Sequence, residues 1–166
     1  KHYPCPAPLS AVRGDPQYGR AMDCTDTSAG DYISSTRSID LDGNGTPENV
    51  RIRIGTFPFM DMKDFMADNS IIDRDKPGEA DALDAYGRQF TYVVTEAQAT
   101  PKYADNMGAI LVTDEFGRTV SNNGNFLLIS HGENGMGARY PDGTTRLACA
   151  GLGKDVENCD SDFEFV

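Results

Sequence analysis

Residues Phe126–Gly137 read FLLISHGENGMG, an apolar run that gives way to a glycine-rich segment. A short apolar run bounded by turn residues predicts a buried β-strand, here Phe126–Ser130. The glycines that follow predict a tight turn, because glycine adopts backbone conformations that other residues avoid. The chain then ends around Cys149 and Cys159. A strand, a glycine-rich turn and a loop that a disulfide can close are typical of an extracellular module.

A second strand is predicted over residues 49–57, which read NVRIRIGTF. Apolar and charged side chains alternate there with a period of two, which is the pattern of a half-buried strand. Its valine and isoleucines are expected to face the core, and Arg51 and Arg53 are expected to face solvent. A strand over residues 32–39 and a turn over Asp40–Glu48 would complete a hairpin.

The rest of the pattern predicts short strands and little helix. Strands are expected over residues 89–95, 109–113 and 119–120, with turns at 114–118 and 122–124. A short helix after Pro58 would carry Met60, Met62, Phe65 and Met66 on one side and end at Pro77-Gly78. A helical turn is expected over Ala80–Tyr86, and a loop over residues 96–108. These elements predict one α+β domain over residues 1–166, an antiparallel sheet with short helices and long loops.

The composition restricts the partners of the chain. It has 166 residues, of which 26 are acidic and 15 basic, for a formal net charge of −11. Phosphate binding needs a basic face, so a nucleic-acid partner is not expected. Peripheral binding to anionic membranes is disfavoured for the same reason. The acidic balance fits either cation binding or solubility alone.

Four cysteines, at positions 5, 24, 149 and 159, form no C-x-x-C pair, so a zinc or dithiol redox site is not expected. They allow three connectivities, of which local pairing, Cys5–Cys24 and Cys149–Cys159, is favoured. Each bond would stabilise a terminal loop by about 2–3 kcal/mol. Residues 1–31 are expected to form an irregular loop held by the first bond. Disulfides persist in oxidising compartments, so a periplasmic or extracellular location is predicted.

The sequence Asp40–Glu48, DLDGNGTPE, has the spacing of a calcium loop. Oxygen ligands at alternate positions can surround one hard cation, and Gly45 permits the sharp turn between them. The candidate ligands are Asp40, Asp42, Asn44, the carbonyl of Thr46, and Glu48. Arg51 stands where an EF-hand has its bidentate Glu, so the loop is similar to the shorter D-x-D-G-x-G-x-x-[DE] loops on extracellular hairpins. A bare turn remains the alternative, because Asp, Asn and Gly are also turn residues.

No catalytic constellation is predicted. Ser130 and His131 are adjacent on a strand and would point to opposite faces, so they cannot act as nucleophile and base. The chain has no G-x-S-x-G motif. No helix is expected after the glycines at 132–137, so phosphate binding there is not expected either. His131 is expected to serve as a turn or hydrogen-bonding residue, and the protein is not expected to be an enzyme.

Several stretches resemble, in order, motifs of the globular heads of type IV pilin-like proteins, including the pseudopilins of type II secretion systems. They are Tyr3–Ala7, Asp15–Gly19, Ile52–Pro58, Ala82–Tyr92 and Phe126–Gly137. Cys149 and Cys159 stand where many pilins close a C-terminal disulfide loop. Together these stretches cover most of the chain.

The resemblance implies an α-helical spine followed by an antiparallel sheet, in a filament or pseudopilus subunit without catalysis. The expected partners are other pilin-like subunits, of the same or a different kind, at the cell surface. Contact with the membrane is expected only through an N-terminal helix, which this chain does not contain. The chain opens at Lys1, as a mature form or after a segment was removed or not included.

Two other functions remain open on the sequence alone. One is a secreted calcium-dependent adhesion or carbohydrate-binding domain that forms no filament. The other is a secreted hydrolase that uses two carboxylates, since acidic residues are plentiful.

Overall fold

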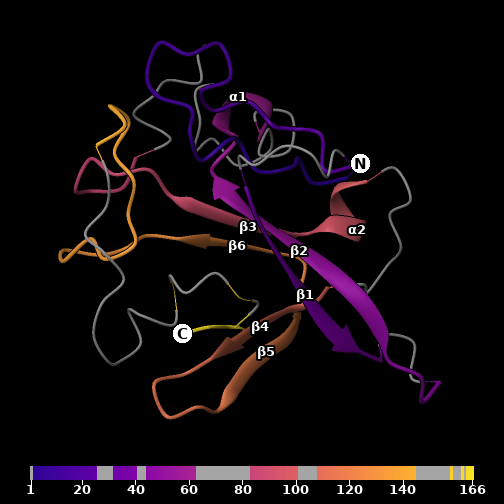
Figure 1. Cartoon of the computed structure of the whole chain (residues 1–166). Coiled ribbons are helices and arrows are strands. Elements are labelled where there is room, and N and C mark those ends of the chain that lie inside the picture. Colours follow the sequence, from indigo (N-terminus) through magenta and orange to yellow (C-terminus); the bar gives the residue numbers. More distant parts are fainter. Residues whose placement is uncertain are drawn as a thin grey trace.

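The computed structural model describes residues 2–25, 32–40, 44–62, 83–100, 108–144, 158, 162 and 164–166. Figure 1 shows their arrangement as two β-sheets with short helices beside the larger one. The elements are β1 (Ile33–Ile39), β2 (Glu48–Thr56), α1 (Phe59–Met62), β3 (Thr91–Thr95), α2 (Glu96–Ala99), β4 (Ile110–Thr113), β5 (Thr119–Gly124), β6 (Phe126–Ile129) and β7 (Glu164–Phe165). In the described part of the chain, neither helix has the length or apolar character needed to cross a membrane.

The larger sheet has four strands in the order β1-β2-β3-β6, all antiparallel. β1 and β2 form the predicted hairpin, in which Ile33 lies opposite Ile54 and Ile39 lies opposite Glu48. β3 occupies an interior position in this sheet. The strands expected over residues 32–39, 49–57 and 89–95 are therefore confirmed, and so is the coarse α+β class.

Both faces of β3 are buried, because residues 2–25 cover one face of the sheet and the smaller sheet packs on the other. Tyr92 and Val94 point to the first face, where they pack with Phe57, Phe59 and the Cys5–Cys24 disulfide. Val93 points to the second face and joins a cluster built on the isoleucines of β2. Because successive side chains of a strand point to opposite faces of the sheet, β3 contributes to two separate hydrophobic cores.

The smaller sheet has the order β5-β4-β7. β4 and β5 form an antiparallel hairpin around the turn predicted at residues 114–118. β7 pairs with β4 in parallel, with Leu111 opposite Glu164 and Val112 opposite Phe165. Ile110 and Phe165 are buried against Val93, so the end of the chain contributes directly to the second core.

Arg53 differs from its predicted position. We expected it on a solvated face, but only 3% of its surface is exposed, whereas Arg51 is exposed as predicted. Its Nη2 atom donates to the carbonyl of Cys24 at 3.0 Å, and its guanidinium lies 4.4 Å from the centre of the Tyr32 ring. Its Nε lies 2.7 Å from a carboxylate oxygen of Glu96, an ion pair without the alignment of a hydrogen bond. Residues 2–25 and α2 therefore cover the face of β2 that carries Arg53. The alternating pattern of the sequence alone predicts that this face is exposed to solvent.

β6 differs from its prediction in a similar way. We expected it to be the last strand and to be buried, but β7 follows it, and β6 forms the edge of the larger sheet. Phe126 and Leu128 are each 40% exposed. The turn predicted at 122–124 is also wrong, because these residues belong to β5 and only Asn125 separates β5 from β6. An apolar run does not distinguish an edge strand from a central one.

The helical predictions are partly wrong. α1 contains Met60 and Met62, but Phe65, Met66 and Pro77-Gly78 lie outside the described residues. Of the helical turn expected over Ala80–Tyr86, residues 80–82 lie outside the described residues, and Leu83–Tyr86 lead into a turn instead of a helix. Residues 96–99, expected as loop, form α2. Such one-turn helices carry too little periodicity to be recognised in a sequence.

The first predicted disulfide, Cys5–Cys24, is present, whereas Cys149 and Cys159 lie outside the described residues. Residues 2–25 are irregular, as expected, but they are tied to the sheet. Ala7 and Thr56 exchange two backbone hydrogen bonds, of 2.9 and 3.0 Å. A side chain at position 55 would fall 2.5 Å from the carbonyl oxygen of Ala7, so Gly55 permits this close approach.

Replacing both Cys5 and Cys24 with alanine should lower the free energy of unfolding by about 3 kcal/mol, because the crosslink restricts the unfolded chain. The bond spans 19 positions, and both cysteines are buried in the first core. Urea unfolding followed by circular dichroism, without reductant, measures the difference. Equal unfolding free energies for the two proteins would show that the crosslink does not stabilise residues 2–25 on the sheet.

Candidate functional site

The predicted calcium loop connects β1 to β2, and its own hydrogen bonds close it. The carboxylate of Asp40 accepts the backbone N–H of Asn44 at 3.1 Å and that of Gly45 at 2.8 Å. The side-chain carbonyl of Asn44 accepts the N–H of Thr46 at 2.7 Å. Gly45 has a φ of +84°, which explains the glycine at this position. Glu48 begins β2 directly opposite Ile39.

Four of the five candidate ligands therefore lie on one short loop, and Asp42 lies outside the described residues. Within the described ranges, no three His, Cys, Asp or Glu side chains come together as a metal site would require. The carboxylate of Asp40 is oriented by loop amides, and the bond from the N–H of Thr46 to the side chain of Asn44 is an Asx turn.

The glycine-rich turn at residues 131–137 is held by Arg88, a residue that the sequence analysis did not single out. The guanidinium of Arg88 donates to the carbonyls of Gly132 and Glu133, the second at 2.8 Å. It also lies 5.9 Å from the ring centre of Tyr140. Gly135 has a φ of +62°, and a Cβ there would fall 2.4 Å from the guanidinium carbon. The left-handed backbone at position 135 therefore favours glycine, and the missing side chain leaves room for the Arg88 guanidinium.

Asp84 is the second residue that sequence reasoning missed. One carboxylate oxygen accepts the N–H groups of Tyr86 and Arg88 at 2.9 and 3.0 Å, and the other accepts the hydroxyl of Ser130 at 3.0 Å. The N–H of Gly87 also donates to the backbone carbonyl of Asp84. The four-residue spacing D-A-Y-G, with its Asp first and Gly last, was the available signal for this turn.

Ser130 and His131 have different partners. The hydroxyl of Ser130 donates to Asp84, whereas Nε2 of His131 is hydrogen-bonded to the hydroxyl of Thr91 at 2.7 Å. Both bonds connect the end of β6 to neighbouring segments of the sheet. These polar groups hold the glycine-rich turn in place.

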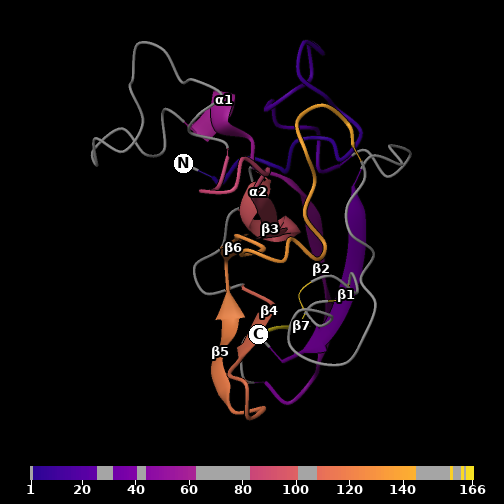
Figure 2. The ribbon, with the colours of Figure 1, turned by 90° about the vertical axis from the view of Figure 1, so that its left-hand side faces the viewer.

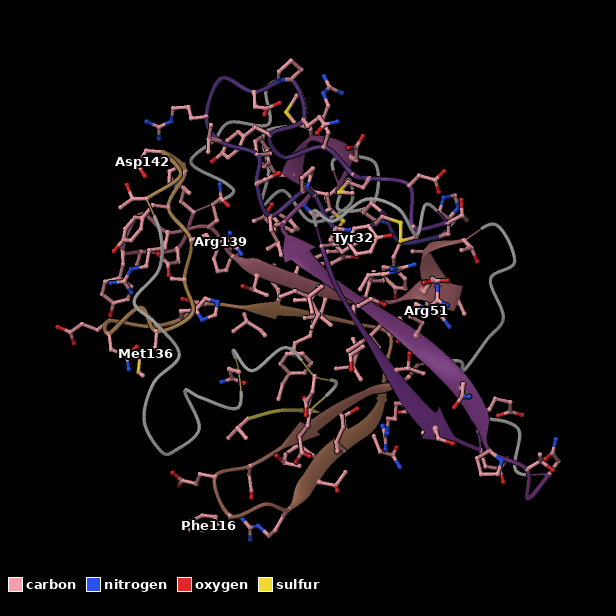
Figure 3. The ribbon with its side chains drawn as sticks, in the orientation of Figure 1. Tyr32, Arg51, Phe116, Met136, Arg139 and Asp142 are labelled. Atoms are coloured by element: carbon pink, nitrogen blue, oxygen red, sulfur yellow. A yellow bond between two sulfur atoms is a disulfide. The ribbon has the colours of Figure 1, made fainter. Side chains whose placement is uncertain are left out.

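An open hollow of about 450 Å³ lies beside this turn, lined by residues 129–134, Met136 and Asn158. In Figure 3 the labelled Met136 lies at the outer side of the turn. A second hollow, of about 310 Å³, includes Glu48, Arg51, Glu96 and Thr100 in its lining. There the carboxylate of Glu96 lies between Arg51 and Arg53, at 3.4 and 2.7 Å. Both hollows are large enough for a small polar ligand.

The tip of the β4–β5 hairpin is exposed and is closed by bonds to Asp114. Asp114 accepts the N–H groups of Phe116 and Arg118 at 2.9 and 3.0 Å, and the Arg118 guanidinium lies 2.6 Å from the same carboxylate. These bonds from Arg118 keep the pKa of Asp114 below its ordinary value. The guanidinium also lies 5.2 Å from the centre of the Phe116 ring. Figure 3 shows Phe116 at the end of the hairpin, away from the body of the molecule.

Comparison with models of known protein families, with curated proteins and with solved structures finds no match to this chain.

Asp84→Ala should lower the free energy of unfolding by about 1–3 kcal/mol, because it removes the acceptor of three hydrogen bonds, one of them from the N–H of the buried Arg88. The matched control is Asp142→Ala, since Asp142 accepts the N–H of Thr144 at 2.8 Å in an exposed turn where water can replace the carboxylate. The control should lose less than about 1 kcal/mol. Urea unfolding measures both. Equal losses in the two variants would contradict a special role for Asp84.

Proposed function

We propose that this chain is the globular head of a non-enzymatic, exported pilin-like or pseudopilin subunit that contributes to a cell-surface filament or a secretion pseudopilus. The observation that carries the proposal is the way in which residues 2–25 are fixed along one face of an antiparallel sheet. A head that transmits force or position within a filament needs a rigid connection at the point where it joins the rest of its subunit.

The start of the described chain supports this proposal. The N–H of Tyr3 donates to the carbonyl of Gln98 at 3.1 Å, and its ring lies 4.9 Å from the ring of Phe126. The hydroxyl of Tyr92 donates to the carbonyl of Pro4 at 3.1 Å, and burial raises the pKa of this phenol. Any segment joined before Tyr3 would thus leave the head from a fixed point beside β6.

The disulfide supports export from the cytoplasm, and the hydrogen bonds of the glycine-rich turn support a structural role for its polar residues. The Cys5–Cys24 bond fits the periplasm or the cell exterior, where disulfides persist. The polar groups of the most distinctive turn, including Ser130 and His131, bond to Asp84 and Thr91 and so stabilise the fold. Docking with other pilin-like subunits is the activity that such a head supports.

A second candidate is a secreted calcium-dependent adhesion or carbohydrate-binding domain. It is favoured by the hollow of about 450 Å³, whose lining includes Ser130, Glu133, Asn134 and Asn158. Hydroxyl, amide and carboxylate groups are the partners that sugar hydroxyls require. This function needs no filament.

We further propose that the β1–β2 loop binds one structural calcium ion through Asp40, Asp42, Asn44, Thr46 and Glu48. Support comes from the alternate spacing of oxygen ligands and from the left-handed conformation of Gly45, which permits a sharp turn. The ion would neutralise clustered carboxylates and fix the end of the hairpin.

Calorimetric titration with calcium tests the loop. The parent protein should bind with a dissociation constant of about 10⁻⁴–10⁻³ M, the range of extracellular modules, and Asp42→Ala should abolish the heat of binding. Asp142→Asn, which changes an acidic residue in another exposed turn, should bind as the parent does. Absence of heat in the parent would assign residues 40–48 to a plain turn.

Fractionation of cells that express the complete gene product tests the main proposal. The protein should be recovered with sheared surface filaments or with a membrane-associated pseudopilus, in crosslinks to pilin-like subunits. Recovery only as a free secreted monomer would contradict it. Glycan binding by that monomer would instead support the second candidate.

A further inference from the structure

The β1–β2 loop carries the only N-x-[ST] sequence of the chain. Of nine asparagines, only Asn44 is followed two positions later by a residue with a hydroxyl group, in the order Asn44-Gly45-Thr46. This order is the acceptor sequence for N-linked glycosylation of exported proteins, provided that the middle residue is not proline. All three residues are exposed. An acceptor must be reachable from outside the protein, and this sequence meets that requirement.

Residues 44–47, the described part of the β1–β2 loop, lie where an enzyme can approach them. In Figure 1 the hairpin of β1 and β2 extends from the larger sheet, and its loop lies at the end of the molecule opposite α1. Figure 2 shows the same loop at the lower end of the molecule. A Cβ atom placed at position 45 meets no atom of the described residues within 4 Å, so the space beside the asparagine is open. A bulky group attached there leaves the packing of both hydrophobic cores unchanged.

The side chain of Asn44 has a defined orientation. Its carbonyl oxygen Oδ1 accepts the N–H of Thr46 at 2.7 Å, in the Asx turn described above. The carboxamide is planar and carries Oδ1 and Nδ2 on different sides, so this bond directs Nδ2 away from the Thr46 N–H. Gly45, with a φ of +84°, reverses the chain between the two residues. The turn therefore places the carboxamide and the threonine, the two groups that an acceptor requires, in one short exposed structure.

We infer that Asn44 is a site of N-linked glycosylation, with an oligosaccharide bound to a polyprenyl diphosphate carrier as the donor. Nδ2 forms a bond to the anomeric carbon of the first sugar, and the bond from that carbon to the diphosphate breaks. The carrier diphosphate leaves, and Nδ2 releases one of its two protons to a base of the transferase. No group is oxidised or reduced. The reaction needs a membrane oligosaccharyltransferase in the oxidising compartment that the Cys5–Cys24 disulfide favours.

The inference goes beyond the proposed function, because it requires export of the chain but no filament. It is also compatible with the proposed calcium site, since glycosylation uses Nδ2 of Asn44 and leaves Oδ1 as an oxygen ligand. A hydrophilic oligosaccharide keeps the surface around it in contact with water. The loop end of the β1–β2 hairpin would therefore face solvent in any assembly of the head, and contacts with partners would lie elsewhere.

The glycine-rich turn contains a matched internal control. Asn134 is also exposed, and its Oδ1 accepts the N–H of Met136 at 3.2 Å in another Asx turn. Gly135, between them, has a φ of +62°, and Gly45 has a φ of +84°. The two asparagines thus share their local geometry and differ in the residue two positions later. Methionine has no hydroxyl group, so Asn134 should stay unmodified.

Peptide mass spectrometry of the exported complete gene product tests the inference. The protein is produced in cells that contain an oligosaccharyltransferase and its lipid-linked donor, and in matched cells in which the transferase is inactive. The peptide with Asn44 should gain the mass of one oligosaccharide only where the transferase is active, and the peptide with Asn134 should gain none. Thr46→Val should lower the modified fraction about tenfold or more, because a site that binds a hydroxyl rejects an analogue without it. Thr46→Ser should be modified as the parent is.

A second set of results separates glycosylation from folding and from the filament function. Thr46→Val should unfold in urea at the same midpoint as the unmodified parent, because its side chain is exposed and keeps its shape. An unmodified Asn44 in cells that do modify a known acceptor protein would overturn the inference, and so would equal modification of Thr46→Val and the parent. Unmodified protein in filaments would refute the glycosylation and leave the filament function standing. Glycosylated protein recovered only as a secreted monomer would do the reverse.

Discussion

The burial of the Arg53 guanidinium is the constraint on which the arrangement of this molecule depends. A buried charge is tolerated only when it is paired and hydrogen-bonded. The partners of Arg53 come from three segments: the carbonyl of Cys24 from the N-terminal region, the carboxylate of Glu96 from α2, and the ring of Tyr32 before β1. One side chain of β2 thereby fixes where residues 2–25 and α2 lie on the sheet. The Cys5–Cys24 disulfide and the backbone hydrogen bonds between Ala7 and Thr56 further stabilise residues 2–25, which the contact with Arg53 also holds on the sheet.

Much of the larger sheet could be predicted from local pattern, and the errors share one cause. Residues 32–39, 49–57 and 89–95 form strands because their alternation or apolar character is strong over a whole element. Arg53 was misplaced because its burial is decided by segments distant in the sequence. β6 was misplaced for the converse reason, since an apolar run does not reveal that a strand has only one neighbour. The periodicity of a sequence shows how polarity alternates along one strand. The burial of a side chain depends also on which other segments pack against that strand.

Around the glycine-rich turn, too, only some of the important residues could be recognised from the sequence. The glycines were recognised, but Arg88 and Asp84, which hold the turn, were not. Their roles depend on contacts 44 and 46 positions away, to Gly132 and Ser130, and nothing local marks such a pairing. The Asp40–Glu48 loop is the opposite case, because its ligand spacing is local and Asp40 does bond within its own loop. Sequence reasoning therefore identified residues that act on their own loop and missed those that connect loops.

The parallel pairing of β4 with β7 has a consequence for how the chain matures. Thr113 and Glu164, which are hydrogen-bonded across this pair, are 51 positions apart, and Asn158 exchanges two hydrogen bonds with Val166 beyond it. A chain that emerges from a ribosome or an export channel from its N-terminus can form the β1–β2 hairpin early. It cannot place Phe165 in the second core until the strand that carries this residue has emerged. Until then the second core lacks Phe165, one of the side chains that pack with Ile110 and Val93.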